Sequence, residues 1–573
     1  MLRHLILKQY LIVVNSLPNH CFKLLYIHIM SFRKILHSSQ NTVTGAAVIL
    51  TIAVLLSRIL GLVRDRLLAG SFGASIDLDI YFAAFRIPDL VYSVLFAGGV
   101  IVSLLPLFAE NFIKDKEKSW DVINNILNIF FISYIISAIL FIIYTPQIIS
   151  SMVAGFDEAS IQKTIALTRL IFASVFFFGV SSIFSTILNY FNRFVSYSLA
   201  PIVYNLGIIL GIIFLSPSLG VFGVGLGVII GSFFHFLIQV PSALKCGYKY
   251  KFIIDFKSPA LREFFGLIIP RTIASSSSQI NFIFITLIAS GIGVGAISIF
   301  NLSNNLRYLP IGIIGVSFAT AIFPLLSKLW AENRKEEYFK EFRKIFNEVL
   351  YISFPIGVLI FILRNEIVDI ILRTGNFGST AVTITAAALG LYFVSTAAQC
   401  LVPVLLRGYF SLKDTVTPTI IAIVSVVANI CLSFFFVGVF GGDNFLVNFI
   451  KNILELDGTA NFSVLGLVVA FNVGLILEFL LLFYFFYKTI GDFGIKKIGI
   501  TFLKILFAST VMGITAWYSL PYLKTTFGSS FVGVSIEFTI VCLVSFIVYC
   551  VLTMMLKMSE IGRVKKIILR NEN

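Results

Sequence analysis

Apolar runs of about 20 residues recur along almost the whole chain, and they constrain its fold more than any other feature. A helix needs about 20 mostly apolar residues to cross the hydrocarbon core of a bilayer. Each run is long enough for one crossing, so the sequence predicts about fourteen transmembrane helices. We expect them at 43–70, 79–109, 122–144, 161–191, 195–215, 220–244, 262–290, 297–327, 345–363, 380–407, 416–440, 463–487, 500–520 and 533–556.

The composition agrees with this reading. Of the 573 residues, 58% are hydrophobic and only 12% are charged, and the mean hydropathy is +0.98. Soluble domains carry roughly 25% charged residues. The predicted fold class is therefore an all-α polytopic membrane protein, and a soluble fold is excluded.

The loops between the runs differ in charge, and this difference predicts their orientation. Alternate connections on one side collect most of the lysines and arginines, among them Lys114, Lys116, Lys118, Lys249, Lys251, Lys335, Lys340, Lys413, Lys496 and Lys497. The other side has little beyond Lys163, Arg364, Arg373, Lys451 and Lys524. Basic loops stay in the cytoplasm, so we expect both termini there. The formal charge of +15 mostly reflects this bias and does not indicate nucleic-acid binding.

Charged and amide side chains inside the runs concentrate in three predicted helices. They occur in "SRILGLVRDRLLAG" at 57–70, in "SIDLDIYFAAFRIPDL" at 75–90 and in "NLSNNLRYLPIG" at 301–312, with a smaller contribution from "PRTIASSSSQIN" at 270–281. Arg58 and Asp65 are seven residues apart on one helix face, so we expect them to compensate each other partly.

Intramembrane charge is costly, so such residues usually face a bundle interior or a watery cavity. Ion pairs that join helices explain single residues, but cations recur on three helices while acids are fewer at mid-depth. We therefore expect a cationic cavity for an anionic ligand, since guanidinium groups bind phosphate oxygens in pairs. Nearby prolines and glycines let helices bend and open a cavity to either side. The sequence thus predicts a transporter.

A short internal repeat predicts the domain organisation. "VSLLPLFAE" and "ATAIFPLLSK" align on Pro106 and Pro324, and each precedes a charged loop. This match predicts two six-helix lobes with two helices left over. The expected boundaries are 1–42 for an N-terminal extension, 43–245 for the N-lobe, 246–488 for the C-lobe and 489–573 for the last two helices and a basic tail. Met30 is an alternative start, with residues 1–29 as a mis-assigned extension.

Several motifs together resemble the MviN-type lipid II flippase family (MurJ) of the MOP exporter superfamily. They are "SRILGLVRDRLLAGSFGASIDLDIYFAAFRIPDL" at 57–90, "SFATAIFPLLSK" at 317–328 and "LRGYFSLKDTVTP" at 406–418. The weaker matches are "ILRTGNF" at 371–377 and "GSFFHFLIQVPSAL" at 231–244. The motifs span both predicted lobes in the family's order.

The resemblance implies an alternating-access exporter in the bacterial plasma membrane. Its substrate would be lipid II, the undecaprenyl-diphosphate-linked peptidoglycan precursor, which moves from the inner to the outer leaflet. The diphosphate and sugars would occupy the central cavity, while the prenyl tail would stay among membrane lipids beside the last two helices. Cell-wall synthesis machinery is the other implied partner.

The family's site residues transfer only in part. Arg58 and Arg64 match two arginines that would contact the diphosphate, and Arg86 matches a basic position beside Pro88. Asp79 matches an acidic position with a gating or ion-pair role, which we also expect for Asp65. Two expected arginines are replaced by Tyr92 and Asn305, and two expected acids by Ala97 and Tyr308. We expect Arg86, Arg271 or Arg307 to supply the missing charge, with Asn305 still at the substrate site.

Coupling residues and cofactors are less constrained. Glu478 lies alone in an apolar run, where it is protonated, hydrogen-bonded to another helix or part of ion or proton coupling. Asn429 offers an oxygen either to a sodium ion or to an interhelical hydrogen bond. The six cysteines show no metal or disulfide spacing, so no covalently bound cofactor or metal is expected.

Other function classes remain as alternatives. The nearest is a related MOP exporter of another polyprenyl-linked oligosaccharide. A drug exporter would favour an acidic cavity, because such exporters usually carry cations. A membrane enzyme would need a catalytic cluster and extended loops, which the sequence lacks. A non-transporting scaffold of cell-wall synthesis would leave the charged cavity unexplained.

Overall fold

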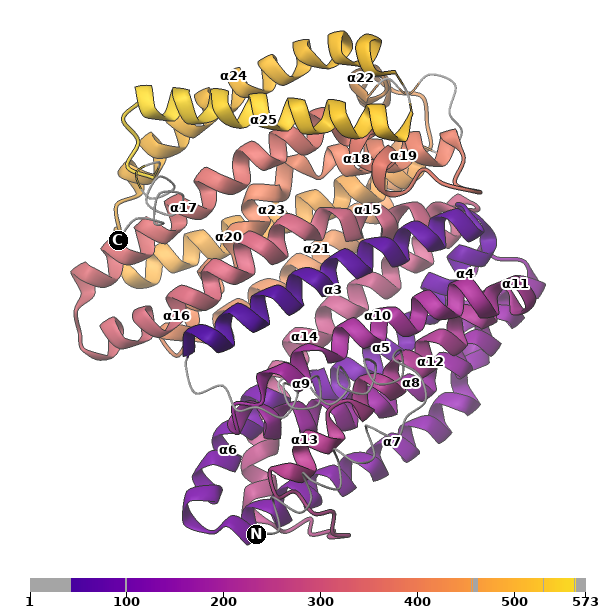
Figure 1. Cartoon of the computed structure of the whole chain (residues 1–573), viewed down its shortest axis with the longest axis vertical. Helices are drawn as coiled ribbons and strands as arrows, with labels where there is room; N and C mark the ends of the chain where they lie inside the picture. The colour runs from indigo at the N-terminus through magenta and orange to yellow at the C-terminus, as the bar shows by residue number, and fades with distance from the viewer. Residues whose placement is uncertain are drawn as a thin grey trace, which may run out of the picture.

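The computed structural model describes residues 43–97, 100–454, 456, 462–528, 530–560 and 562, and over these ranges the chain is helical without strands. The expected N-terminal extension 1–42 with Met30 and most of the basic tail lie outside these ranges. Figure 1 shows two bundles of tilted helices that lie side by side. This arrangement confirms the predicted fold class of an all-α membrane protein with two lobes.

The N-lobe contains the elements that precede the basic connection at 246–258. They are α3 (Val43–Phe72), α4 (Ile76–Ala84), α5 (Arg86–Tyr92), the π-helical η1 (Ser93–Ala97), α6 (Val100–Lys114), α7 (Lys116–Met152), α8 (Glu158–Tyr190), α9 (Phe194–Ser198), α10 (Ala200–Leu210), η2 (Gly211–Leu215), α11 (Ser216–Leu219), α12 (Val221–Leu237) and α13 (Val240–Lys245).

The C-lobe and the last two helices follow. They are α14 (Pro259–Ile292), α15 (Ala296–Pro310), η3 (Ile311–Gly315), α16 (Val316–Ala331), α17 (Lys335–Ile362), α18 (Arg364–Ile371), α19 (Ser379–Leu391), α20 (Phe393–Ser411), α21 (Val416–Phe440), α22 (Phe445–Leu454), α23 (Ser463–Ile490), α24 (Ile495–Phe527) and α25 (Phe531–Met555). Figure 1 shows α24 and α25 along the edge of the C-lobe that faces away from the N-lobe.

Twelve helices within the described ranges are long and apolar enough to cross a membrane, so the predicted count of about fourteen is not confirmed. The predicted runs at 43–70 and 79–109 are helical but are not among the twelve. The first forms the continuous α3, which carries the opening charges. The second is divided into α4, α5, η1 and α6.

The breaks in two corresponding helices have a physical cause. Pro88 in α5 lacks an amide hydrogen, and η1 follows one turn later. Pro310 ends α15 and is followed at once by η3. Each π-helical segment leads into a helix with an internal proline, Pro106 in α6 and Pro324 in α16. Prolines and π-bulges are the usual causes of helix kinks, so both lobes contain a kinked helix at the equivalent place.

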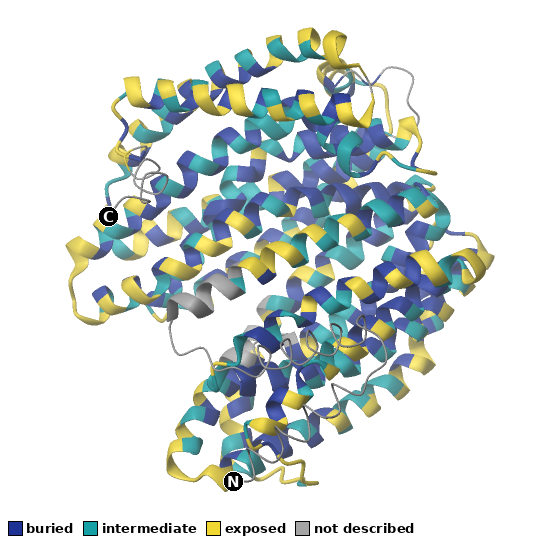
Figure 2. Ribbon diagram, viewed as in Figure 1, coloured by how far each residue is buried: buried dark blue, intermediate teal, exposed yellow. Residues whose placement is uncertain are grey.

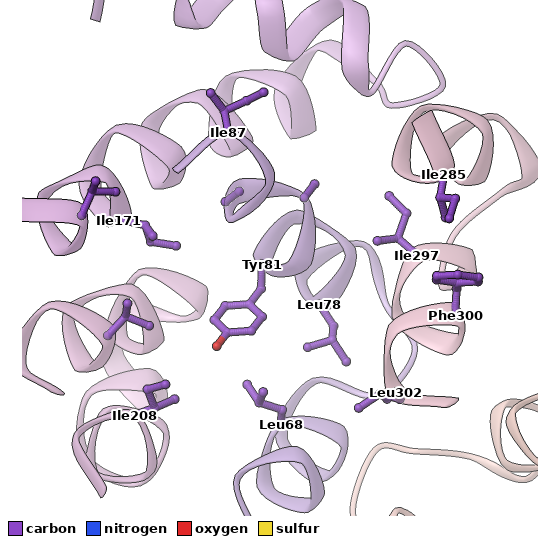
Figure 3. Close-up of a cluster of buried hydrophobic side chains, with 14 of the residues drawn as sticks. Leu68, Leu78, Tyr81, Ile87, Ile171, Ile208, Ile285, Ile297, Phe300 and Leu302 are labelled. Atoms are coloured by element: carbon purple, nitrogen blue, oxygen red, sulfur yellow. The ribbon is translucent and has the colours of Figure 1, made fainter. Parts of the chain in front are cut away.

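The core continues from one lobe into the other through α4. Figure 3 shows Tyr81 and Leu78 of α4 between Ile208 of α10 on one side and Ile297 and Phe300 of α15 on the other. Figure 2 shows this interior as buried, whereas exposed residues follow the outward sides of α24 and α25. Many of these exposed side chains are large and apolar, as expected for a surface in contact with lipid.

Candidate functional site

A cavity of about 500 Å³ lies where the two lobes meet. Its wall comes from α3, α4, α5, α8, α10 and α12 of the N-lobe and from α15 of the C-lobe. Among the lining residues that the structure describes, the charged side chains are Arg64, Arg86 and Asp89, joined by the amides of Asn301 and Asn305. The lining therefore carries two guanidinium groups and one carboxylate, which is fewer cations than the sequence predicts.

Arg64 is held by neighbours on two helices, α3 and α10, and its partner Asp65 is bonded in turn by α15. Its Nη2 lies 2.8 Å from Asp65 Oδ1, and its Nη1 donates to Asn205 Oδ1 of α10 at 3.2 Å. The other Asp65 oxygen accepts from Asn305 Nδ2 of α15 at 3.1 Å. The Arg64 side chain keeps 23% of its surface exposed, so it is oriented yet still available to a ligand. Asn205 was missed in the sequence because a lone asparagine after Pro201 gives no distinct signal.

Arg86 of α5 also lines the cavity, and its hydrogen bonds link the two lobes. Its Nε donates to Thr286 Oγ1 of α14 at 2.9 Å, and its Nη2 donates to Asn301 Oδ1 of α15 at 2.5 Å. Its guanidinium lies 5.2 Å from the centre of the Phe282 ring. Asp89, one turn along α5, attracts Arg86 electrostatically. Arg86 is thus fixed by C-lobe groups while it borders the cavity.

Aromatic side chains cover the N-lobe part of the wall. Tyr81, Tyr92, Phe178, Tyr204 and His235 all line the cavity. Tyr92, at a position where the resemblance implies an arginine, shares a hydrogen bond with Ser182 of α8 at 3.0 Å. Phe178 packs edge-on against both Tyr204 and His235. The N-lobe wall thus presents aromatic rings beside its charged groups.

The remaining predicted arginines lie elsewhere. Arg58 lies over the Tyr308 ring at 5.1 Å, next to Gly312 and not against Asp65, so the expected compensation between Arg58 and Asp65 is not found. Asp65 is bonded to its neighbour Arg64 instead. The described cavity wall does not include Arg58.

Arg307 is buried inside the C-lobe and does not line the cavity. Its guanidinium lies 5.0 Å from the Tyr392 ring and 4.8 Å from the Phe471 ring, and it donates to Gln399. The helical repeat explains this position, because Arg307 is about 200° around α15 from Asn305. The backbone of Arg271 belongs to α14, but its side chain lies outside the described part of the structure.

Asp79 is fully buried, with 0% exposure, and links α4 to the C-lobe. Its carboxylate accepts from the backbone amides of Gly295 at 2.6 Å and Ser298 at 2.7 Å, and from the Ser298 hydroxyl. These groups begin α15, whose free amides and dipole favour a negative charge. Asp79 thus ties α4 to the start of α15 without an ion pair among the described residues, and its gating role stays a prediction.

Further contacts close the same end of the molecule. Arg66 Nη1 donates to the Ile370 carbonyl at the end of α18 at 2.5 Å. The Asn376 amide donates to the Gly70 carbonyl at 2.9 Å, and its side chain donates to the Ser71 carbonyl at 2.8 Å. These hydrogen bonds between the lobes lie at the cavity or at this end. The two lobes are therefore hydrogen-bonded to each other at this end of the cavity.

The two predicted coupling residues lie close together but away from the cavity wall. Asn429 of α21 is buried, and its Oδ1 accepts from Ser433 of the same helix at 3.0 Å. It faces Gly474 of α23, one turn before the half-buried Glu478. The described residues contain no group of three or more His, Cys, Asp or Glu side chains that could hold a metal ion.

Comparisons with known proteins agree with this architecture. The family model described as "Lipid II flippase MurJ" matches residues 68–537. A relative from Buchnera aphidicola subsp. Schizaphis graminum, described as "Probable lipid II flippase MurJ", is 30% identical over 81% of this chain and 93% of the relative.

Two solved structures share the fold. "Lipid II flippase MurJ, inward closed conformation" has a TM-score of 0.72 and 26% identity, covering 89% of this chain and 98% of that one. An inward-facing multidrug resistance MATE family transporter of the MOP superfamily has a TM-score of 0.63 at 15% identity, covering 78% of this chain and 98% of that one.

Proposed function

This chain belongs to the lipid II flippase MurJ family, and on that premise we propose that it moves lipid II from the inner to the outer leaflet of the bacterial plasma membrane. The observation that carries the proposal is the cavity between the lobes, which is lined by Arg64 and Arg86. At one end of this cavity the two lobes are hydrogen-bonded to each other. A flippase needs such a cavity because a diphosphate headgroup cannot cross the hydrocarbon core unassisted.

In this proposal the charged residues and the aromatic residues of the cavity wall bind different parts of the headgroup. Arg64 supplies paired N–H donors to the diphosphate, and Arg86 adds a second positive charge. The aromatic wall offers flat apolar faces to the sugars, while Asn301 and Asn305 donate or accept hydrogen bonds. The prenyl tail stays in the bilayer beside α24 and α25, whose outward faces are apolar.

We infer alternating access from the interlobe hydrogen bonds at one end of the cavity. We assign the end with Asp79, Arg66 and Asn376 to the outer face and the basic loops and both termini to the cytoplasm. The cavity then receives the headgroup from the cytoplasmic side. Release outside requires the contacts around Asp79 to break, and the kinks at η1 and η3 give the helices places to bend.

The driving force is assigned to a cation gradient or to the membrane potential. Glu478 is the proposed coupling residue for a proton or a sodium ion, because a carboxylate in an apolar helix favours binding either one. Asn429 of α21 faces Gly474 of α23, which lies one turn before Glu478. Asn429 would supply a neutral oxygen to the bound cation. We further propose that the cell-wall synthesis machinery receives the exported precursor.

Rescue of a bacterium depleted of its own lipid II flippase tests the function. The full chain should restore growth, and Arg64→Ala should fail at equal membrane expression because the diphosphate loses its paired donors. Arg169→Ala is the matched control: this arginine lies on α8 but is exposed and bonds only the Ile142 carbonyl among the described contacts. Rescue by a well-expressed Arg64→Ala variant would reject the site, and failure of the parent in direct lipid II transport would favour another polyprenyl-linked substrate.

A further inference from the structure

Two buried carboxylates lie where α18 meets α24 and α25, far along the chain from the cavity residues. Glu366 of α18 is 3% exposed, and Glu537 of α25 is 0% exposed. Apolar residues of the same elements, including Leu363, Ala516 and Val541, form a separate small core beside them. The last two helices are thus attached to the C-lobe through a contact that contains two acids.

These acids have fewer partners than their charges require. Lys524 Nζ of α24 lies 3.7 Å from one oxygen of Glu366, but more than half of the Lys524 side chain is exposed. The second oxygen of Glu366 and both oxygens of Glu537 are buried without a hydrogen-bond partner among the described residues. Glu366 and Lys524 are the charged groups that act on Glu537 electrostatically. If both acids were ionised, the Glu537 carboxylate would lie beside the Glu366 carboxylate and would share with it the attraction of one largely exposed lysine.

Of the nearby charged groups, Arg364 attracts the Glu366 carboxylate and Asp369 repels it, whereas Glu537 is influenced only by Glu366 and Lys524 among the described residues. Asp369, one turn after Glu366, pairs with the exposed Arg373 at 3.3 Å and adds a further negative charge. Arg364 directs its guanidinium to the Phe361 carbonyl at 2.9 Å and lies over the Phe361 ring. From α3, Arg66 reaches the carbonyls of Ile370 and Ile371 at the end of α18. Buried charge without a partner is strongly disfavoured, so the contact needs a bound cation.

The donor set identifies the cation. Divalent ions take six or more oxygen ligands, and the described residues form no cluster of three or more acidic, histidine or cysteine side chains suited to a metal. A proton needs only one carboxylate oxygen and removes one of the two charges. Two carboxyl groups in one enclosed site commonly retain a proton for this reason.

We propose that Glu366 and Glu537 form a proton-binding site that joins α25 to α18. In the joined state one carboxyl group, that of Glu537, carries the proton, and Lys524 balances the Glu366 carboxylate. When the proton passes to water, Glu537 becomes a second enclosed carboxylate beside Glu366, the two repel each other, and α25 separates from α18. This site goes beyond the proposed function, because it requires no particular transported lipid.

The location of the site connects it to the interlobe closure. Arg66 of the N-lobe bonds the last carbonyls of α18 and also lies 5.4 Å from the centre of the Phe531 ring at the start of α25. A change in the α18–α25 contact therefore reaches the closing contacts through one side chain. The site couples the position of the last two helices to the joined end of the lobes.

The test measures the distance between α25 and the segment after α18 as pH changes. Spin labels are placed at Val532→Cys and Thr380→Cys, both exposed, after the six native cysteines are replaced. The protein is held in lipid nanodiscs, and double electron–electron resonance is recorded between about pH 5.5 and about pH 9, the range in which buried glutamates titrate. The parent should lengthen this distance as pH rises. Glu537→Gln, which stays neutral, should keep the short distance throughout.

Two controls separate the proposal from other causes. Asp443→Asn removes an exposed acid of the 441–444 loop and should leave the parent's pH response unchanged. Glu366→Gln should abolish or weaken the response, since one carboxylate then pairs with Lys524. A pH response that persists in Glu537→Gln, a parent that does not respond, or a distance set by sodium instead of pH would each overturn the proposal. Because no readout uses transport, these outcomes do not depend on the proposed function.

Discussion

Asp79 is the side chain on which the closure of the lobes depends most directly. It is buried, no lysine or arginine of the described residues forms an ion pair with it, and its charge is stabilised by the amides that begin α15. An ion pair would be indifferent to where α15 begins, whereas this arrangement exists only when the helix start faces α4. The carboxylate therefore recognises one position of the C-lobe.

Removal of this carboxylate should loosen the closure. We predict that Asp79→Ala costs about 1–2 kcal/mol of closure, because a helix loses its cap and an enclosed charge loses its donors. The amides of Gly295 and Ser298 should then exchange with deuterium roughly 5–30 times faster, as measured by mass spectrometry of the peptide that contains them. Ser298→Ala is the control, since it removes a hydroxyl donor and leaves both amides bonded. Unchanged exchange in Asp79→Ala would contradict the gating role.

At this scale the sequence predicted residue types better than their partners. Arg64 and Arg86 could be placed near a cavity because charge inside an apolar run needs a polar environment. The position of Arg307 could not, because its burial depends on Tyr392 and Phe471, which are distant in the chain. The pairing of Asp65 with its neighbour Arg64 also differs from the spacing rule, since an arginine is long enough to fold back along its own helix.

Glycines allow α10, and the η2 segment that continues it, to approach α12 very closely. A methyl group on Gly207 would lie 2.3 Å from the Gly231 Cα, and one on Gly211 would lie 2.7 Å from the Gly227 Cα. Small residues allow this approach, which gains van der Waals contact where no hydrophobic effect separates protein from lipid. This close helix contact holds Tyr204 of α10 at the cavity wall and Asn205 of α10 beside Arg64.

A larger residue in this contact should therefore destabilise the N-lobe. We predict that Gly227→Val costs about 1–3 kcal/mol, because the helix backbones must separate to admit the side chain. Thermal unfolding in detergent is the measurement, and the midpoint should fall. Gly438→Val is the matched control in α21, where a methyl group meets no atom within 4 Å. Equal midpoints for the two variants would show that the α10–α12 contact is not limiting.

The sequence predicted that the helices exist, but it did not predict where they are interrupted. The apolar runs located every helix bundle because length and hydropathy decide membrane insertion. Pro88 indicated a kink in the run at 79–109, yet the π-helical turn η1 depends on packing against α14 and α8. The count of fourteen assumed that each run is one crossing helix.

The whole molecule is organised around an interface that must open and close. α14 illustrates this organisation, because it packs against α5, α6 and α7 of the N-lobe and against α21 of the C-lobe. The sequence repeat indicated two lobes, but it did not indicate that α14 packs against both of them. A repeat shows which helices correspond to each other and does not show how they pack. The attachment of α24 and α25 beside α18 was likewise absent from the local pattern.

A covalent lock across the joined end should stop transport. A Cβ atom on Gly70 would lie 3.7 Å from Thr374 Cβ, which suits a disulfide. In a background without native cysteines, we predict that Gly70→Cys with Thr374→Cys forms a cross-link on oxidation and loses rescue of flippase-depleted cells. Growth should return after a membrane-permeant reductant is added. Each single cysteine variant is the control, and sustained growth of fully cross-linked cells would exclude opening at this end.

Direct transport of lipid II by the purified chain in liposomes tests the central claim. Lipid II is placed in both leaflets, and its exposure to an impermeant probe is followed over time. We predict that the parent moves lipid II across the bilayer, and that Arg64→Ala, folded and reconstituted equally, does not. A folded parent that leaves lipid II in its starting leaflet, with a gradient or membrane potential applied, would contradict the account.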